Sequence, residues 1–276
     1  MAQIQPLLGT LQKLKRKTLR ALFHYDPSYT DMFADKSELY FARLYLHQMF
    51  PYLEQLPEGA KILDAGCQAG RFTVALGKMG FHLTGVDTSG LSLSRAKKHC
   101  KESNVKAEFI RGEISNVCDR LPPRSFDLIL CAEVLYLYPH FESLMQSMLN
   151  VLKPGGLLIT SHRTRFYYLT KALIQKDLQT ARFIIDNCEG SLWGTYFNWQ
   201  TVAELRDLHS RLGLQTEGIR PIGIFSEIFL SPGDMENSLQ DQLFDIEKEP
   251  FDAVTGCTRY LLAIGKKISD SNPHLS

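Results

Sequence analysis

Two acidic residues stand 23 positions apart, each at the end of a short apolar run. Asp64 ends the first run and Asp87 ends the second, and a turn of small residues between Gly66 and Gly70 follows Asp64 and opens a helix. Glycines let the backbone approach a ligand closely, and the free amides and positive dipole end of the helix face the bound molecule. A carboxylate at the position of Asp87 can accept hydrogen bonds from both hydroxyls of a ribose. The spacing therefore predicts a site for a ligand that carries a nucleoside.

The same turn argues against a nicotinamide dinucleotide. Such a site needs Gly-x-Gly-x-x-Gly, whereas Gln68 stands at the middle position here and Asp64 precedes the first glycine. A carboxylate would repel a pyrophosphate but stabilise a cationic ligand. A nicotinamide-dependent oxidoreductase is thus the least favoured enzyme class.

Composition restricts the remaining possibilities. The 276 residues are 44% hydrophobic and carry a net charge of +1, which suits one globular unit and gives no bias toward nucleic acid. The six cysteines have no close pairs and no histidines at zinc-ligand spacing, so we expect free thiols in a reducing compartment and no metal. No run approaches the ~20 apolar residues that span a bilayer, and no signal peptide is recognisable. We expect a cytoplasmic protein without a membrane span.

The elements that position these residues alternate along the chain. From Lys61 onward, short apolar runs are each followed by a helical segment, which is typical of a doubly wound sheet with crossover helices. The expected strands are Lys61 to Asp64, His82 to Asp87, Ala107 to Arg111, Phe126 to Cys131 and Gly156 to His162. The expected later elements are one or two helices over Arg165 to Asp186, an irregular stretch from Cys188 to Trp199, a helix from Thr201 to Leu212, and two strands, Gln215 to Phe225 and Thr258 to Lys266, around an acidic helix from Met235 to Glu247. The last two strands would close the sheet as a pair.

Two further motifs lie at the ends of the third and fourth expected strands, and a third motif is a turn that leads into the fifth. They are Gly112-Glu113-Ile114, Cys131-Ala132-Glu133 and the turn Leu152-Lys153-Pro154-Gly155-Gly156. With the first loop, this ordered set resembles the class I S-adenosylmethionine-dependent methyltransferases over about residues 60 to 165. The resemblance implies an α/β, Rossmann-like, seven-stranded sheet that is mostly parallel, has an antiparallel last strand and is flanked by helices. It also implies methyl transfer from S-adenosylmethionine, with S-adenosylhomocysteine as the product.

The resemblance assigns cofactor roles position by position. Asp64, Gly66 and Gly70 would surround the methionine part, Asp87 would take the ribose, and Glu113 with Ile114 would take the adenine. The full set of expected cofactor residues is Arg43, Asp64, Gly66, Gln68, Gly70, Asp87, Thr88, Glu113, Ile114 and Ala132. Arg43, on an expected helix from Ser37 to Phe50, would hold the carboxylate of the cofactor, with Tyr40 or His47 as alternatives. Gln68 replaces the glycine most common at its position, so we expect either a tighter loop or a hydrogen bond from the side-chain amide to the ligand.

Catalysis and acceptor binding are expected beyond the fourth and fifth strands. Because the reaction is an in-line displacement, alignment alone can supply ~7–11 kcal/mol, and only some acceptors need a base. The candidate bases are His162, Glu133 and Tyr136, with His140 as a weaker one, although a structural role is the favoured interpretation of each taken singly. The expected substrate residues are Arg163, Arg165, Trp193, Tyr196 and Trp199, in a lid at about residues 163–200. Packing of the tryptophans against the main domain and surface exposure of the arginines are the alternatives.

Three functions remain open. The first is methylation of a small organic acceptor at oxygen or nitrogen. The second is methylation of RNA or protein, suggested by a basic amphipathic stretch from Leu11 to Leu22, although nucleic acid is not the expected partner. The third is a non-catalytic S-adenosylmethionine-binding module. We expect residues 1–55 to form a helical segment over the cofactor site, 56–268 the catalytic domain and 269–276 a frayed tail, in a monomer or homodimer.

Overall fold

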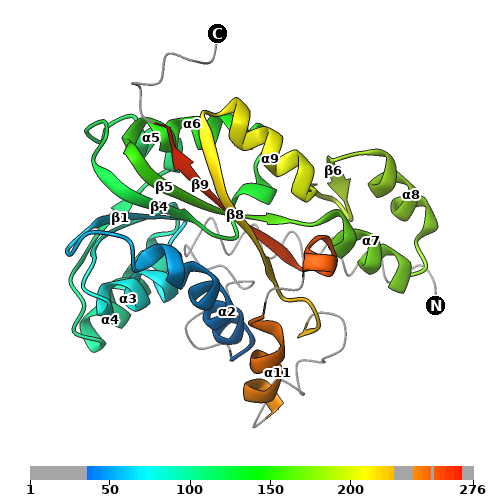
Figure 1. Cartoon of the computed structure of the whole chain (residues 1–276), viewed down its shortest axis with the longest axis horizontal. Coiled ribbons are helices and arrows are strands. Elements are labelled where there is room, and N and C mark those ends of the chain that lie inside the picture. The colour runs from blue at the N-terminus through cyan, green and yellow to red at the C-terminus, as the bar shows by residue number, and fades with distance from the viewer. Residues whose placement is uncertain (1–35, 227–238, 250–251, 269–276) are drawn as a thin grey trace, which may run out of the picture.

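The computed structural model describes residues 36–226, 239–249 and 252–268. Seven strands form one sheet in the order β3-β2-β1-β4-β5-β9-β8 (Figure 1). They are β1 (Lys61–Ala65), β2 (His82–Asp87), β3 (Ala107–Arg111), β4 (Phe126–Cys131), β5 (Leu152–Arg163), β8 (Leu214–Ile222) and β9 (Tyr260–Lys267). The first five are parallel, and β9 is antiparallel to both β5 and β8. The expected sheet is confirmed, including the final pair of strands.

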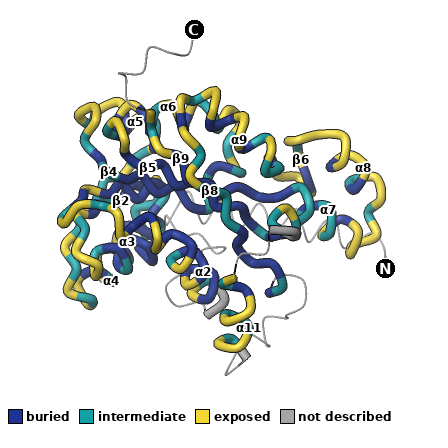
Figure 2. The backbone as a smooth tube through the Cα atoms, viewed as in Figure 1, coloured by how far each residue is buried: buried dark blue, intermediate teal, exposed yellow. Residues whose placement is uncertain are grey.

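Helices cover both faces of this sheet, so its strands are buried on both sides (Figure 2). One face carries α2 (Lys36–Leu53), α3 (Arg71–Lys78) and α4 (Gly90–Glu102); the other carries α5 (Ile114–Cys118), α6 (Phe141–Val151) and α9 (Val202–Arg211). Side chains alternate along each strand: Leu128 and Leu130 pack in the core on the α2 side, whereas Ile129 packs on the α6 side. This alternation determines which residues at the strand ends share a face.

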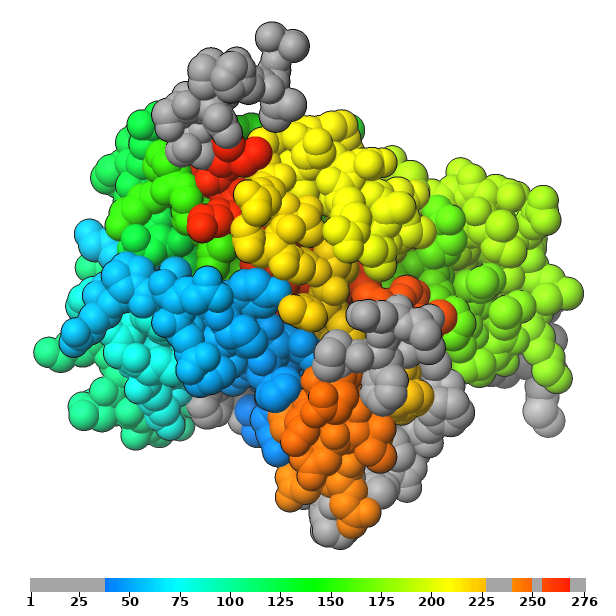
Figure 3. All heavy atoms as spheres, viewed as in Figure 1, coloured from blue at the N-terminus to red at the C-terminus, as the bar shows by residue number. Residues whose placement is uncertain are grey.

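The helix α2 is held by the late helix α11 (Leu239–Glu247), which lies beside it in Figures 1 and 3. The phenol of Tyr40 donates a 2.6 Å hydrogen bond to Glu247, and the amide of Gln48 donates one of 2.9 Å to the Lys248 carbonyl. The basic stretch at residues 11–22 and the tail at 269–276 lie outside the described residues.

A small lobe follows β5, and it forms the light green projection in Figure 3. Two helices, α7 (Arg165–Ile174) and α8 (Leu178–Asp186), precede a hairpin of β6 (Glu189–Leu192) and β7 (Thr195–Asn198). The expectation of irregular structure from Cys188 to Trp199 was wrong. Trp193 and Gly194 both have positive φ, 51° and 82°, as two-residue hairpin turns require, but Trp-Gly lacks the Asn-Gly signal of such turns.

Two short 3-10 helices, η1 (Leu135–Leu137) and η2 (Asp252–Cys257), lie near the carboxyl edge of the sheet. No described helix is long and apolar enough to cross a membrane. Within the described residues, no group of three or more His, Cys, Asp or Glu side chains comes together as metal ligands would. All six cysteines lie in the described part and are free thiols.

Candidate cofactor pocket and its polar network

The loop after β1 is shaped by a buried carboxylate and two glycines. Asp64 accepts a 2.6 Å hydrogen bond from the Thr73 hydroxyl on α3, and burial raises the pKa of Asp64 to about 6. Gly66 and Gly70 both have φ of 86°, and a Cβ on Gly66 would lie 2.3 Å from a methyl of Val134. Only glycine at position 66 therefore allows the loop to pass so close to the end of β4.

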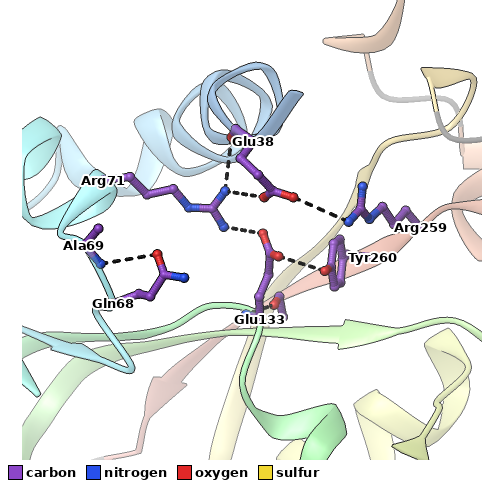
Figure 4. A network of polar contacts seen from close by, with 8 residues as sticks. Glu38, Gln68, Ala69, Arg71, Glu133, Arg259 and Tyr260 are labelled. Carbon is purple, nitrogen blue, oxygen red and sulfur yellow. Dashed lines mark hydrogen bonds and ion pairs between the residues drawn. The ribbon is translucent and has the colours of Figure 1, made fainter. Parts of the chain in front are cut away.

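Gln68 adopts the left-handed conformation, with φ of 44°, which glycine adopts more readily than other residues. Its backbone N–H donates a 3.0 Å hydrogen bond to Asp87. Its side-chain oxygen accepts one of 3.3 Å from the Ala69 N–H (Figure 4). The other oxygen of Asp87 accepts a 2.8 Å bond from the Ser89 N–H. Burial raises the pKa of Asp87, and these backbone bonds oppose that rise. The carboxylate at the end of β2 is thus fixed against the loop after β1.

A pocket, called here the first pocket, opens at the carboxyl ends of β1, β2 and β4. Its lining residues are Gly66, Cys67, Gln68, Arg71, Phe72, Asp87, Thr88, Gly112, Ile114, Ala132, Glu133, Val134, Leu137 and Tyr138. The expected cofactor residues among them are Gly66, Gln68, Asp87, Thr88, Ile114 and Ala132. The structure therefore brings most of the expected set to one place.

The other expected cofactor residues lie outside this lining. Asp64 and Gly70 instead stabilise the loop after β1, through the hydrogen bond with Thr73 and the positive φ of Gly70. Glu113 accepts a 3.2 Å hydrogen bond from Tyr138, which does line the pocket. Arg43 is turned away toward α11, where it pairs with Asp241 at 2.8 Å and stacks over Phe244.

Arg71, the first residue of α3, is the arginine that lines the pocket, and Glu133 is its acidic neighbour. Arg71 pairs with Glu38 at 2.9 Å and with Glu133, and all three side chains are largely buried (Figure 4). Tyr260 donates a 2.8 Å hydrogen bond to Glu133, and Arg259 pairs with Glu38 at 3.8 Å. We call these five residues the polar network.

Sequence reasoning found only Glu133 among the five members of this network. Arg71 was visible, because it directly follows Gly70 in the loop motif. Glu38, Arg259 and Tyr260 carry no local signal, since they enter from α2 and from the start of β9.

The charge state of Glu133 follows from its neighbours. Burial would raise the pKa of Glu133, but the guanidinium groups of Arg71, Arg259 and Arg163 outweigh burial and hold that pKa below its usual range. Glu133 also has φ of 61°, a backbone conformation that non-glycine residues adopt at a cost and that is often found at functional sites. It is an ionised carboxylate and a weak base.

Arg163, at the end of β5, lies among aromatic rings. Its guanidinium carbon is 3.9 Å from the ring centre of Tyr260, 4.1 Å from that of Tyr167 and 5.0 Å from that of Tyr136. The side chain is 7% exposed, and among the described residues its Nε and Nη1 find no hydrogen-bond acceptor. Tyr136 itself stacks on Phe197 of the hairpin.

His162 points to the opposite face of the sheet from Arg163. It packs against Phe141 and shares hydrogen bonds with Thr160 at 2.8 Å and Gln200 at 3.2 Å. Burial lowers the pKa of His162 to about 3, so its imidazole is neutral. It does not line the first pocket, and His140 is the N-terminal cap of α6.

The remaining substrate candidates lie in the lobe. Trp199 is fully buried and donates a 2.7 Å hydrogen bond to the Asn187 carbonyl. The phenol of Tyr196 donates a 2.5 Å hydrogen bond to Glu189. Trp193 is 42% exposed at the hairpin turn. Arg165 pairs with Glu204 at 3.4 Å. None of the four is among the described residues that line the first pocket.

Comparison with known proteins agrees with this geometry. A family model described as a methyltransferase domain matches residues 56–204, which is more than half of the chain. The chain therefore belongs to this family of methyltransferase domains. Together with the sheet order and the first loop, the match identifies a class I S-adenosylmethionine-dependent methyltransferase domain.

Curated relatives match part of the chain. The ubiquinone biosynthesis O-methyltransferase of Idiomarina loihiensis is 34% identical over 107 residues, which are 39% of this chain and 44% of that protein. Its counterpart from Pasteurella multocida is 30% identical over 131 residues, 42% of this chain and 54% of that protein. The chain thus spans about half the length of the curated relatives it matches.

Solved structures share the fold over a longer stretch. An S-adenosylmethionine-dependent methyltransferase from Mesorhizobium loti has a TM-score of 0.55 and 20% identity, covering 81% of this chain and 100% of that one. One from Methanosarcina mazei has a TM-score of 0.56 and 18% identity, covering 80% and 98%. At these identities the likeness concerns the fold alone.

Proposed function

We propose that this protein transfers the methyl group of S-adenosylmethionine, bound in the first pocket, to a small organic acceptor. The observation that carries the proposal is the convergence of Asp87, the Gly66 loop and Glu133 on one pocket at the carboxyl edge of the sheet. Oxygen is the favoured acceptor atom, because the matched relatives are named as O-methyltransferases. Nitrogen is the alternative.

The charges of the first pocket suit a cationic nucleoside. Its charged lining residues are Asp87, Glu133 and Arg71, and the guanidinium of Arg71 is already paired with two glutamates. A pyrophosphate would face two carboxylates there, whereas a sulfonium is stabilised by them. The tight passage at Gly66 also lets backbone amides approach a ligand closely.

We assign the roles as follows. Asp87 accepts hydrogen bonds from the ribose hydroxyls, Ile114 packs against the adenine with Glu113 near its edge, and Gly66 and Ala132 border the methionine chain. We leave Arg43 out of this set, because Asp241 already pairs with it on the α11 side.

The bound cofactor supplies an activated methyl group: the acceptor atom forms the new bond to carbon as the carbon–sulfur bond breaks, sulfur keeps that electron pair, and the acceptor proton leaves to solvent. We propose that Glu133 acts by charge and position, because a carboxylate with a lowered pKa is a poor proton acceptor. His162 has no role in this scheme, since it is neutral in the core on the other face of the sheet.

Calorimetry and a turnover assay test the proposal. We expect S-adenosylhomocysteine to bind the full chain and NAD not to bind it. Binding of NAD without S-adenosylhomocysteine would overturn the cofactor assignment. We also expect release of S-adenosylhomocysteine from S-adenosylmethionine in the presence of phenolic and amine acceptors. Cofactor binding without release across that panel would indicate a binding module.

RNA or protein methylation is tested by a separate variant. Deletion of residues 1–22 removes the basic stretch that suggests it. We expect unchanged turnover of small acceptors. Loss of turnover on an RNA or peptide substrate, with none on small molecules in the intact chain, would favour the alternative.

A further inference from the structure

A second pocket lies at the same carboxyl edge of the sheet, between α7 and the chain that leads into β9. Its lining residues are Phe166, Tyr167, Thr170, Lys171, Ile174, Gln175, Gly223, Cys257, Thr258 and Arg259. Figure 1 shows α7 beside η2, the short helix just before β9, and the two elements are in contact. The pocket is thus built where β5 and β8 end and β9 begins.

The described charged residues that line the second pocket are all positive. Lys171 and Arg259 are cations, whereas the described lining residues include no aspartate or glutamate. Phe166, Tyr167 and Ile174 supply apolar surface. Such a lining suits a small molecule that joins an apolar body to an anionic group.

Arg163 adds a third cation directly behind this wall. Its guanidinium stacks on Tyr167, which lines the second pocket, and on Tyr260 next to Arg259. The side chain is 7% exposed, and its Nε and Nη1 lack an acceptor within the described parts of the chain. Arg163 interacts electrostatically with Glu133. The carboxylate oxygens of Glu133, however, already pair with Arg71 and accept a hydrogen bond from Tyr260. Buried donors on a cation are costly to leave without an acceptor, so an anionic ligand that reached these donors would be stabilised.

The polar network connects this second pocket to the first one. Arg259 lines the second pocket and pairs with Glu38, and Glu38 pairs with Arg71, which lines the first (Figure 4). Tyr260 lies between Arg163 and Glu133, in contact with both. The two pockets therefore share one set of buried charges.

We propose that the methyl acceptor is a small carboxylic acid with an apolar body, which binds in the second pocket with its carboxylate recognised by Arg163 and Arg259. This inference rests on the proposed function, because it treats the second pocket as the acceptor side of the first. Arg163 is the residue that determines the preference for an acid. Lys171, at the outer part of the same wall, contributes charge without a buried contact.

The experiment compares a charged probe with its neutral analogue. Binding of 4-hydroxybenzoate and of 4-hydroxybenzamide to the full chain is measured by ligand-observed NMR, with and without saturating S-adenosylhomocysteine. We expect the acid to bind at least about tenfold more tightly than the amide, since hydrogen bonds to a charged group supply that difference. Arg163→Met should abolish the preference, and Arg163→Lys should keep part of it.

Arg165→Met is the matched control, because Arg165 begins α7 two positions after Arg163 but pairs with Glu204. It should keep the full preference, and all variants should bind S-adenosylhomocysteine like the wild type. Equal binding of acid and amide by the wild type, or an undiminished preference in Arg163→Met, would overturn the inference. Failure of S-adenosylhomocysteine to bind the wild type, with the acid preference intact, would overturn the proposed function and leave an acid-binding pocket.

Discussion

Tyr260 donates a 2.8 Å hydrogen bond to Glu133 across 127 positions of sequence. This contact joins the first residue of β9 to the loop after β4, beside the ion pair between Glu133 and Arg71. Residues 56–204 match the family model, so Tyr260 lies beyond the matched region. The strand β9 therefore has two roles: it pairs with β5 and β8 in the sheet, and its first residue completes the polar network.

Glu133→Ala should strongly destabilise the protein. Glu133 is the buried partner of Arg71, and removal of one member of a buried ion pair typically costs 3–5 kcal/mol, because the other charge stays buried. We expect a decrease of about 3–5 kcal/mol in the free energy of unfolding, measured by urea denaturation at pH 7. Glu142→Ala is the control: its pair with Arg211 is exposed, and we expect a loss of less than about 1 kcal/mol. Equal losses in the two variants would contradict the importance of burial.

Asp87→Ala should weaken cofactor binding. A carboxylate that binds a ribose makes charged hydrogen bonds worth about 1.5–3 kcal/mol each, so loss of one or more such bonds should lower the affinity for S-adenosylhomocysteine by about 10- to 100-fold. Isothermal titration calorimetry measures the change. Asp119→Ala, at the exposed end of α5 and outside the first pocket, should bind like the wild type. An unchanged affinity in Asp87→Ala would remove Asp87 from the ribose assignment.

Two substitutions of Gln68 separate the effect of its backbone conformation on stability from the effect of its side chain. Both Gln68→Gly and Gln68→Ala remove the amide that accepts from Ala69, but only glycine relieves the φ of 44°. We expect the glycine variant to be more stable than the alanine variant by about 1 kcal/mol, the difference between left-handed strain and the entropy of glycine. Thermal denaturation of the two variants gives the comparison. A more stable alanine variant would show that the loop is unstrained at this position.

The sequence predicted what local patterns determine. The strands from His82 to Asp87 and from Ala107 to Arg111 match their expected bounds, because short apolar runs between helical segments define them. Asp87 was expected at the cofactor site because a strand end is visible in the sequence. The face of the sheet toward which a neighbouring residue points was harder to foresee.

Position on the strand explains the different placement of His162 and Arg163. Both end β5 and both were candidates, yet alternation places only Arg163 on the side of Tyr260 and Glu133. Arg43 was expected to hold the carboxylate of the cofactor, with Tyr40 or His47 as alternatives, because the sequence gives no sign that α11 supplies Asp241 as the partner of Arg43. Contacts between distant segments decided these assignments.

His162 should make stability depend on pH. Burial lowers its pKa from about 6.5 to about 3, so between these values the unfolded chain binds more protons than the folded one. The contribution of neutral His162 to the free energy of unfolding is therefore fully present above pH 6.5 and is lost as the pH decreases toward 3. His162→Gln removes this titration, whereas the raised pKa of Asp64 acts equally in both proteins and cancels in the comparison. From pH 7.5 to pH 5, we expect the wild type to lose about 2 kcal/mol more unfolding free energy than His162→Gln. Parallel losses in urea titrations over this range would show that His162 becomes protonated without unfolding.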